Sequence, residues 1–160
     1  MMLTHPLPII VIDGRNSARS KYGKANWSHV LLAATHFSDM LFRVFVIMPH
    51  WAGKDLIEKI REVAKIQFVD ISHDAEYDDK IALGLCIVED GYYVSNDRNM
   101  HKHLNGNLID RTWCSSRRIG FHIDEDENFV PHYPESWHSK IVGTVEAMDV
   151  VKQITREVRE

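Results

Sequence analysis

Apolar and polar positions alternate along the chain in blocks that predict strands and helices in turn. Uninterrupted apolar or β-branched runs predict strands at 8–12, 43–48, 67–71, 92–95 and 119–123, followed by a short extended segment at 129–131. Helical spacing of apolar residues predicts helices at 27–40, 54–65, 78–90, 99–104 and 145–158. Residues 17–26 are predicted to form a loop, and residues 108–118 an irregular or helical segment. This alternation predicts a three-layer α/β domain, with a mainly parallel central sheet of about five strands flanked by helices.

Length and composition are those of an ordinary globular domain. The 160 residues suit a single domain spanning 1–160, and no apolar run approaches the roughly 20 residues that cross a bilayer. The first eight residues lack the features of a signal peptide, and the two cysteines form neither a disulfide framework nor a zinc site. We therefore expect a cytoplasmic protein with no membrane partner.

Four aspartates are predicted to meet at one edge of the sheet. Asp13 directly follows the first strand, Asp78 and Asp79 begin a helix, and Asp97 lies just past the strand at 92–95. In a right-handed helix-then-strand unit, the start of the helix and the carboxyl end of the strand lie at the same edge. Taken singly, each aspartate also has a structural explanation, as a turn residue or as a helix cap.

Charge favours a metal at this edge. These four aspartates equal the whole excess of acidic over basic residues, 23 against 19, so the rest of the chain is balanced and basic patches are allowed. Four ionised carboxylates held together repel one another and destabilise the fold. A hard divalent cation such as Mg²⁺ removes that repulsion, and it can activate water for attack on a phosphodiester.

Five motifs occur in an order that resembles one family of nucleases. They are Ile-Val-Ile-Asp-Gly-Arg-Asn (10–16), Met-Pro-His-Trp (48–51), Tyr-Asp-Asp-Lys (77–80), Gly-Tyr-Tyr-Val-Ser-Asn-Asp (91–97) and Phe-Val-Pro (129–131). Across about 8–134 the chain resembles the NYN/PIN-like ribonuclease domain of the Regnase type (MCPIP, CCCH-zinc-finger ribonuclease). Residues 135–160, expected to form a C-terminal loop and helix, have no matching motif.

The resemblance implies a PIN-like fold and a Mg²⁺-dependent endoribonuclease acting on single-stranded or loop RNA, with Mn²⁺ as a second candidate ion. It assigns the metal to Asp13, Asp78, Asp79 and Asp97. It makes Asn16 a residue that orients the site, and it makes Ser95 and Asn96 residues that line the site.

An RNA substrate requires cations for its phosphates and flat side chains for its bases. The candidate cations near the predicted edge are Arg15, Arg19, Lys21, Lys24, Lys80 and Arg98. Trp51, at the end of the second strand, is the candidate for a base contact. The alternative for each cation is a solvated surface charge, and for Trp51 a packed loop.

Two departures from the family pattern favour a different function. The family usually has serine where Arg15 stands, and it commonly has an acid at the position of His101. They favour a catalytically inactive PIN-like RNA-binding module. A phosphatase-like hydrolase or phospho-acceptor receiver ranks third, because no Asp-x-Asp follows the first strand. The helix at 145–158 is expected to pack on the sheet, with a homodimer contact as the alternative.

Overall fold

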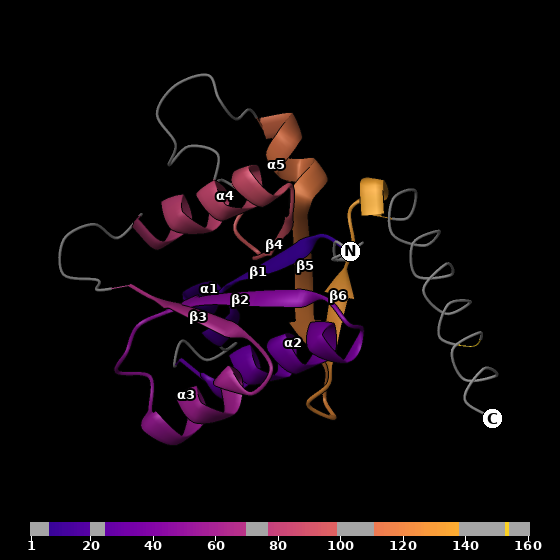
Figure 1. Cartoon of the computed structure of the whole chain (residues 1–160). Coiled ribbons are helices and arrows are strands. Elements are labelled where there is room, and N and C mark those ends of the chain that lie inside the picture. Colours follow the sequence, from indigo (N-terminus) through magenta and orange to yellow (C-terminus); the bar gives the residue numbers. More distant parts are fainter. Residues whose placement is uncertain (1–6, 20–24, 70–76, 99–110, 138–152, 154–160) are drawn as a thin grey trace.

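The centre of the protein is a six-stranded sheet in the order β3-β2-β1-β4-β5-β6 (Figure 1). The structure is a computed structural model that describes residues 7–19, 25–69, 77–98, 111–137 and 153. The strands are β1 (Ile9–Asp13), β2 (Arg43–Met48), β3 (Lys65–Phe68), β4 (Tyr92–Val94), β5 (Arg118–Ile123) and β6 (Phe129–His132). The first five are parallel, and β6 pairs antiparallel with β5. The predicted three-layer α/β fold is therefore confirmed.

Five helices in the described part of the chain cover the sheet. They are α1 (Gly14–Ala18), α2 (Ser28–Asp39), α3 (Lys54–Arg61), α4 (Tyr77–Glu89) and α5 (Arg111–Arg117). Figure 1 shows α2 and α3 on one face and α4 and α5 on the other. Each face has its own apolar core: Ile10, Ile12, Phe37 and Phe129 belong to the α2 side, and Ile9, Val11, Leu83 and Tyr93 belong to the α4 side.

Strand β1 lies at the middle of both cores. Its residues Ile9–Ile12 are fully buried, and alternate side chains enter the two cores. Burying apolar side chains of this size stabilises the fold by about 1.5–3 kcal/mol each. The position at which β1 ends, and with it the position of Asp13, is therefore held by packing on both faces.

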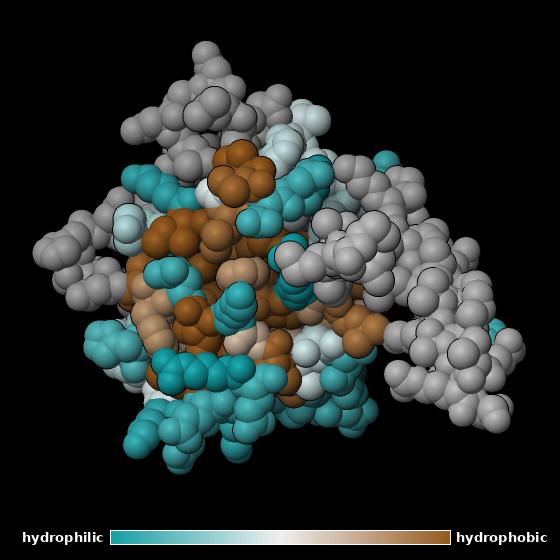
Figure 2. All heavy atoms as spheres, viewed as in Figure 1, coloured by the Kyte–Doolittle hydropathy of each residue, from teal (hydrophilic) through white to brown (hydrophobic). Residues whose placement is uncertain are grey.

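Helix α3 is amphipathic. Ile57 and Ile60 are buried, while the charged residues of the helix face solvent. In Figure 2 the lower border of the molecule, which α3 forms in Figure 1, is correspondingly hydrophilic. The charged face of α3 lies on the opposite side of the sheet from α4 and α5.

Four predicted elements differ from the structure. The helix predicted at 54–65 ends at Arg61, because a turn at 62–64 leads into β3, which begins at Lys65. The loop predicted at 17–26 begins later, because α1 continues through Ala18. The third strand begins at Lys65 rather than at residue 67. It is an edge strand with one exposed face: Lys65 and Gln67 are exposed, while Ile66 and Phe68 pack on the α2-side core, so its start is not a continuous apolar run. The sheet has six strands rather than about five, because the predicted extended segment pairs with β5 as β6.

The remaining predictions are confirmed or fall outside the described residues. Asp90 adopts a left-handed conformation (φ 53°) and Gly91 N–H donates to Cys86 O, so Asp90-Gly91 ends α4 as predicted. The helices predicted at 99–104 and 145–158, with the associated dimer contact, lie outside the described residues except for residue 153, which is helical and exposed. In the part that is described, no helix combines the length and apolar composition of a bilayer span.

Candidate metal centre

The four aspartates line one open cleft of about 360 Å³ at the carboxyl edge of the sheet. Asp13 is the last residue of β1, Asp78 and Asp79 are in the first turn of α4, and Asp97 follows β4. Strands β1 and β4 are parallel neighbours, with Ile12 opposite Val94, so their carboxyl ends emerge side by side. The tertiary structure thus brings together residues that are up to 84 positions apart in the chain.

Three of the four carboxylates form the tight centre of this cleft. One oxygen each from Asp13, Asp78 and Asp79 lies within 4.8 Å of the other two. Asp97 lines the same cleft but stands outside this group of three. Closely spaced carboxylate oxygens are the ligands that Mg²⁺ and similar hard cations prefer, so the donor set fits such an ion.

Asp13 also has a local structural role. It caps α1, where its Oδ1 accepts a hydrogen bond from Asn16 N–H at 3.3 Å, and its Oδ2 accepts one from Ser95 Oγ at 3.4 Å. At Gly14 an added Cβ would lie 2.4 Å from Ile47 O, so the neighbouring strand leaves room only for glycine. The cap therefore holds the Asp13 carboxylate in position at the floor of the cleft.

Burial and mutual repulsion perturb the acids of the cleft. Burial, followed by the charges of Asp79 and Asp78, raises the pKa of Asp13 to about 7. Burial, followed by the charges of Asp78 and Asp97, raises the pKa of Asp79 to about 6. Two neighbouring acids that resist ionisation need either protons or a cation between them. The acids of the cleft could therefore hold a cation.

Arg15 supplies a positive charge inside the cleft. Its Nη1 lies 3.5 Å from Asp78 Oδ2, and its charge offsets a small part of the rise in the pKa of Asp79. The Arg15 side chain is 38% exposed, so it can also reach a bound anion. Arg15, which the sequence placed near this edge, therefore contacts the acid cluster directly.

A hydrogen-bond network joins the carboxyl ends of β1 and β4 to the middle of β5. Asn16 Oδ1 accepts from Asn96 N–H at 2.7 Å, and Ser95 Oγ accepts from Asp97 N–H at 3.1 Å. The Asn96 amide pairs with Phe121, donating to its O at 3.0 Å and accepting from its N–H at 2.9 Å. Asn16, Ser95 and Asn96 thus tie β1, β4 and β5 together, and they orient the residues that line the cleft.

For the ribonuclease activity that the resemblance of the motifs implies, replacing Asn16 with alanine is expected to lower RNA cleavage by about 10–100-fold, the usual cost of losing a residue that orients metal ligands. The free energy of unfolding should fall by only about 0.5–1.5 kcal/mol, because one hydrogen bond is lost. Asn128→Ala is the matched control, since the Asn128 amide bonds Asp124 in the β5–β6 turn. Steady-state cleavage rates and thermal unfolding are measured for both variants. Equal activity of Asn16→Ala and Asn128→Ala would contradict an orienting role for Asn16.

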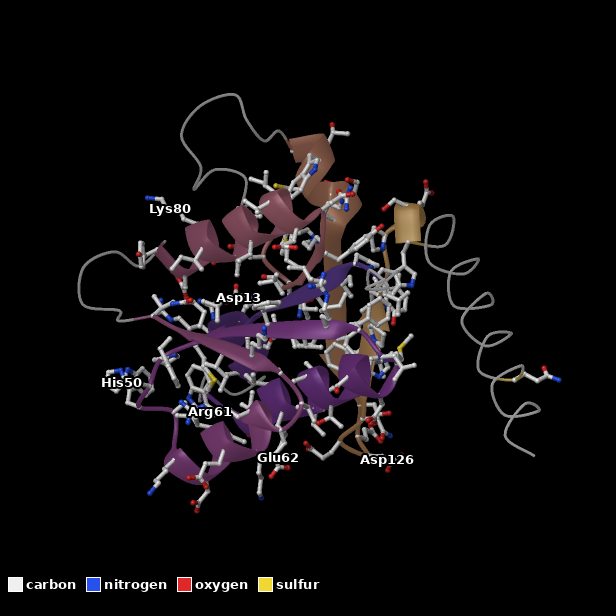
Figure 3. All side chains as sticks on the ribbon, in the orientation of Figure 1. Asp13, His50, Arg61, Glu62, Lys80 and Asp126 are labelled. Carbon is white, nitrogen blue, oxygen red and sulfur yellow. The ribbon has the colours of Figure 1, made fainter. Side chains whose placement is uncertain are left out.

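The remaining predicted substrate residues fall into three groups. Arg19 lines the cleft, and Arg98 lines a smaller neighbouring pocket. Lys80 is not among the described residues of the cleft, and in Figure 3 its side chain points outward from α4, away from Asp13. Lys21 and Lys24 lie outside the described residues.

Sequence reasoning missed Trp27 as a cleft residue. Trp27 and Trp51 both line the cleft, and their rings meet edge to face with centroids 5.7 Å apart. The pattern assigned Trp27 to the start of a helix. Its position directly after a basic loop was the signal that pointed to the cleft.

The mostly parallel sheet, with an acidic cleft at its carboxyl edge, is consistent with a PIN-like NYN fold. A model of the Zc3h12a-like ribonuclease NYN domain matches residues 6–143. Since this covers most of the chain, the protein belongs to the Zc3h12a-like ribonuclease NYN domain family, and the resemblance of its motifs is confirmed. Among curated proteins no match is found.

Proposed function

We propose that this domain is a metal-dependent endoribonuclease that hydrolyses phosphodiester bonds in single-stranded or loop RNA. The observation that carries the proposal is the group of three aspartate oxygens within 4.8 Å, at the floor of an open cleft, in a chain of a ribonuclease family. The site residues would be Asp13, Asp78, Asp79 and Asp97, holding Mg²⁺ or Mn²⁺. Because Mg²⁺ usually keeps several waters, Asp97 can act without touching the ion directly.

The cation and the side chains of the cleft would have different roles in the reaction. When bound, the cation would polarise a phosphoryl oxygen and lower the pKa of water. The chain itself supplies the rest: Arg15 and Arg19 attract the phosphate, and the network of Asn16 and Ser95 holds the carboxylates. Positioning of this kind accounts for a large part of the rate enhancement in phosphoryl chemistry.

The two tryptophans favour an unpaired substrate. Trp51 is 61% exposed, and with Trp27 it forms an aromatic wall of the cleft that contains the aspartates. Bases in single strands or loops can leave their stack and lie on an aromatic ring, whereas bases in a duplex cannot. The cleft therefore suits a single-stranded or loop segment.

Replacing Trp51 with alanine is expected to weaken RNA binding by about 5–150-fold, corresponding to about 1–3 kcal/mol for one stacked base. Trp51→Phe keeps an aromatic ring and should recover most of the affinity. Fluorescence anisotropy with a labelled single-stranded RNA in EDTA measures both. Equal weakening by alanine and phenylalanine would count against stacking.

The function is tested by incubating the purified protein with a single-stranded RNA, the matching duplex and the matching DNA, each with Mg²⁺, Mn²⁺ or EDTA. A circular RNA is included, since only an endonuclease can open it. We expect metal-dependent cleavage of the single-stranded and circular RNA, and its loss in Asp97→Asn. Cleavage that persists in EDTA, or in Asp97→Asn, would refute the proposal.

The alternative is a catalytically inactive PIN-like RNA-binding module. One observation favours it: Arg15 pairs with Asp78, one of the three carboxylates of the tight group, and so competes with a cation for that oxygen. RNA that binds without metal and is not cut under any of these conditions would select this alternative.

A further inference from the structure

A small pocket beside the acidic cleft is lined by three arginines. Arg98, Arg111 and Arg118 surround a cavity of about 70 Å³, together with Tyr93, Cys114 and Ser115. Among the described residues that line this arginine pocket, none is acidic. A pocket of about this size has room for a single oxyanion group. The pocket is therefore a candidate site for one phosphate.

The fold holds Arg118 in place. Arg118 is the first residue of β5 and pairs in register with Tyr93 of β4. Its Nη1 donates a hydrogen bond to Ser95 O at 3.1 Å, and a Cβ at Gly120 would come within 2.9 Å of the same Nη1. Glycine at 120 thus leaves room for the guanidinium, so this arginine is positioned rather than free to leave the pocket.

The other two arginines retain their donors for a ligand. Arg98 and Arg111 are exposed, and within the described part of the chain no hydrogen bond or ion pair engages either of them. Arg117, the neighbour of Arg118, shows the opposite case: it is buried and bonds the carboxylate of Asp90. Guanidinium groups gathered without a carboxylate attract an oxyanion, which they bind through several parallel hydrogen bonds.

The floor of the pocket strengthens that attraction. Tyr93 and Cys114 are almost completely buried, and the Tyr93 hydroxyl donates to Cys114 O at 3.3 Å instead of pointing into solvent. Charges that lie against such an apolar floor interact more strongly than charges in open water. The binding energy of an oxyanion here is therefore larger than for scattered surface arginines.

Two connections place the pocket next to the acidic cleft. Arg98 directly follows Asp97, and Arg118 holds the carbonyl of Ser95, whose hydroxyl bonds Asp13. The pocket lies on the side of the sheet covered by α4 and α5, as Figure 1 shows for the elements that carry it. The pocket and the cleft are thus linked through residues 95–98, which follow β4.

We propose that the arginine pocket binds a backbone phosphate of the RNA strand, at least one nucleotide away from the phosphodiester that is cut. The inference rests on the proposed function, because it names a second contact for the same substrate. It gives the strand a path from the tryptophan wall across the aspartates towards α5. Substrates too short to fill both places lose this contact.

The test compares Arg111→Gln with Arg61→Gln. Arg111 is exposed and without bonds in the described part of the chain, so its loss leaves the fold intact. Arg61 loses the same charge on α3, across the sheet from the pocket (Figure 3). Anisotropy with a ten-nucleotide single-stranded RNA in EDTA, over a range of salt, measures binding. Cleavage of this RNA and of a dinucleotide in Mg²⁺ measures kcat/KM.

We expect Arg111→Gln to weaken binding of the ten-nucleotide RNA several-fold, and to reduce the slope of log affinity against log salt by about 0.7, the value for one phosphate contact with a single strand. The advantage in kcat/KM of the long RNA over the dinucleotide should shrink by the same factor, and Arg61→Gln should match the wild type. Equal effects of the two variants, or no RNA binding by the wild type, overturn the inference. If the wild type binds but cuts nothing, the proposed function fails, while the binding data still decide the pocket.

Discussion

Replacing Asp13 with asparagine is expected to reduce RNA cleavage at least about a hundredfold and, in the same protein, to stabilise the metal-free fold at neutral pH. Loss of a residue that merely orients a metal ligand costs about 10–100-fold, so loss of a ligand should cost more. The gain in stability arises because Asp13 is only 4% exposed and lies among other acids: burial, followed by the charges of Asp79 and Asp78, raises its pKa to about 7. A neutral amide of the same shape avoids that repulsion.

The measurements are kcat/KM with saturating Mg²⁺ and the melting temperature in EDTA at a pH above 7. Asp126→Asn is the matched control, because Asp126 is exposed in the β5–β6 turn, away from Asp13 (Figure 3). It should change neither quantity. If Asp13→Asn loses activity and stability together, the residue acts as a helix cap and the metal assignment loses its support.

The stability of the metal-free protein is expected to fall as the pH rises from about 4 to about 7. Asp13 and Asp79 have folded-state pKa values of about 7 and about 6, both above the ordinary value of 3.8. Between these limits the folded protein binds more protons than the unfolded chain, so the free energy of unfolding decreases with rising pH. The contribution of these two protonated acids to stability is fully present below about pH 4. The total loss is on the order of a few kcal/mol, at 1.36 kcal/mol per pKa unit.

A divalent cation should reverse this trend. Cation binding requires ionised carboxylates, so Mg²⁺ or Mn²⁺ competes with the protons and raises the melting temperature above pH 7 far more than near pH 5. Melting curves across this range, with EDTA or Mn²⁺, test both statements. In Asp13→Asn the dependence in EDTA should flatten, with only the contribution of Asp79 left. A wild-type curve in EDTA that does not change between pH 5 and pH 7 contradicts the prediction.

The acids of the cleft show how a structural and a functional interpretation of one residue can both hold. Asp13 was open to explanation as a turn residue, and it does cap α1. The same carboxylate is one of the three whose oxygens lie within 4.8 Å. The helix cap is a local interaction, because Asp13 accepts a hydrogen bond from a residue only three positions later. The cluster of carboxylates instead depends on the packing of α4 against β1.

Some side-chain contacts in the cleft could not be predicted from the sequence. The sequence placed Arg15 and Asp78, 63 positions apart, near the same edge of the sheet, but it did not predict the ion pair between them. The place of Trp27 in the cleft wall likewise depends on its contact with Trp51, across the loop that follows β2. Side-chain contacts of this kind depend on how the elements pack, which single-sequence patterns do not contain.

By itself the sequence determined the α/β architecture, the parallel centre of the sheet and the four aspartates at one edge. It could do so because apolar runs, helical spacing and the handedness of strand–helix–strand units are local or topological properties. Only the tertiary structure decided which carboxylates form the tight group, that Arg15 enters that group, and that three arginines make a second pocket beside it. These depend on distances of a few ångströms between side chains far apart in the chain, and such distances are set by the packing of α4, α5 and the strand ends.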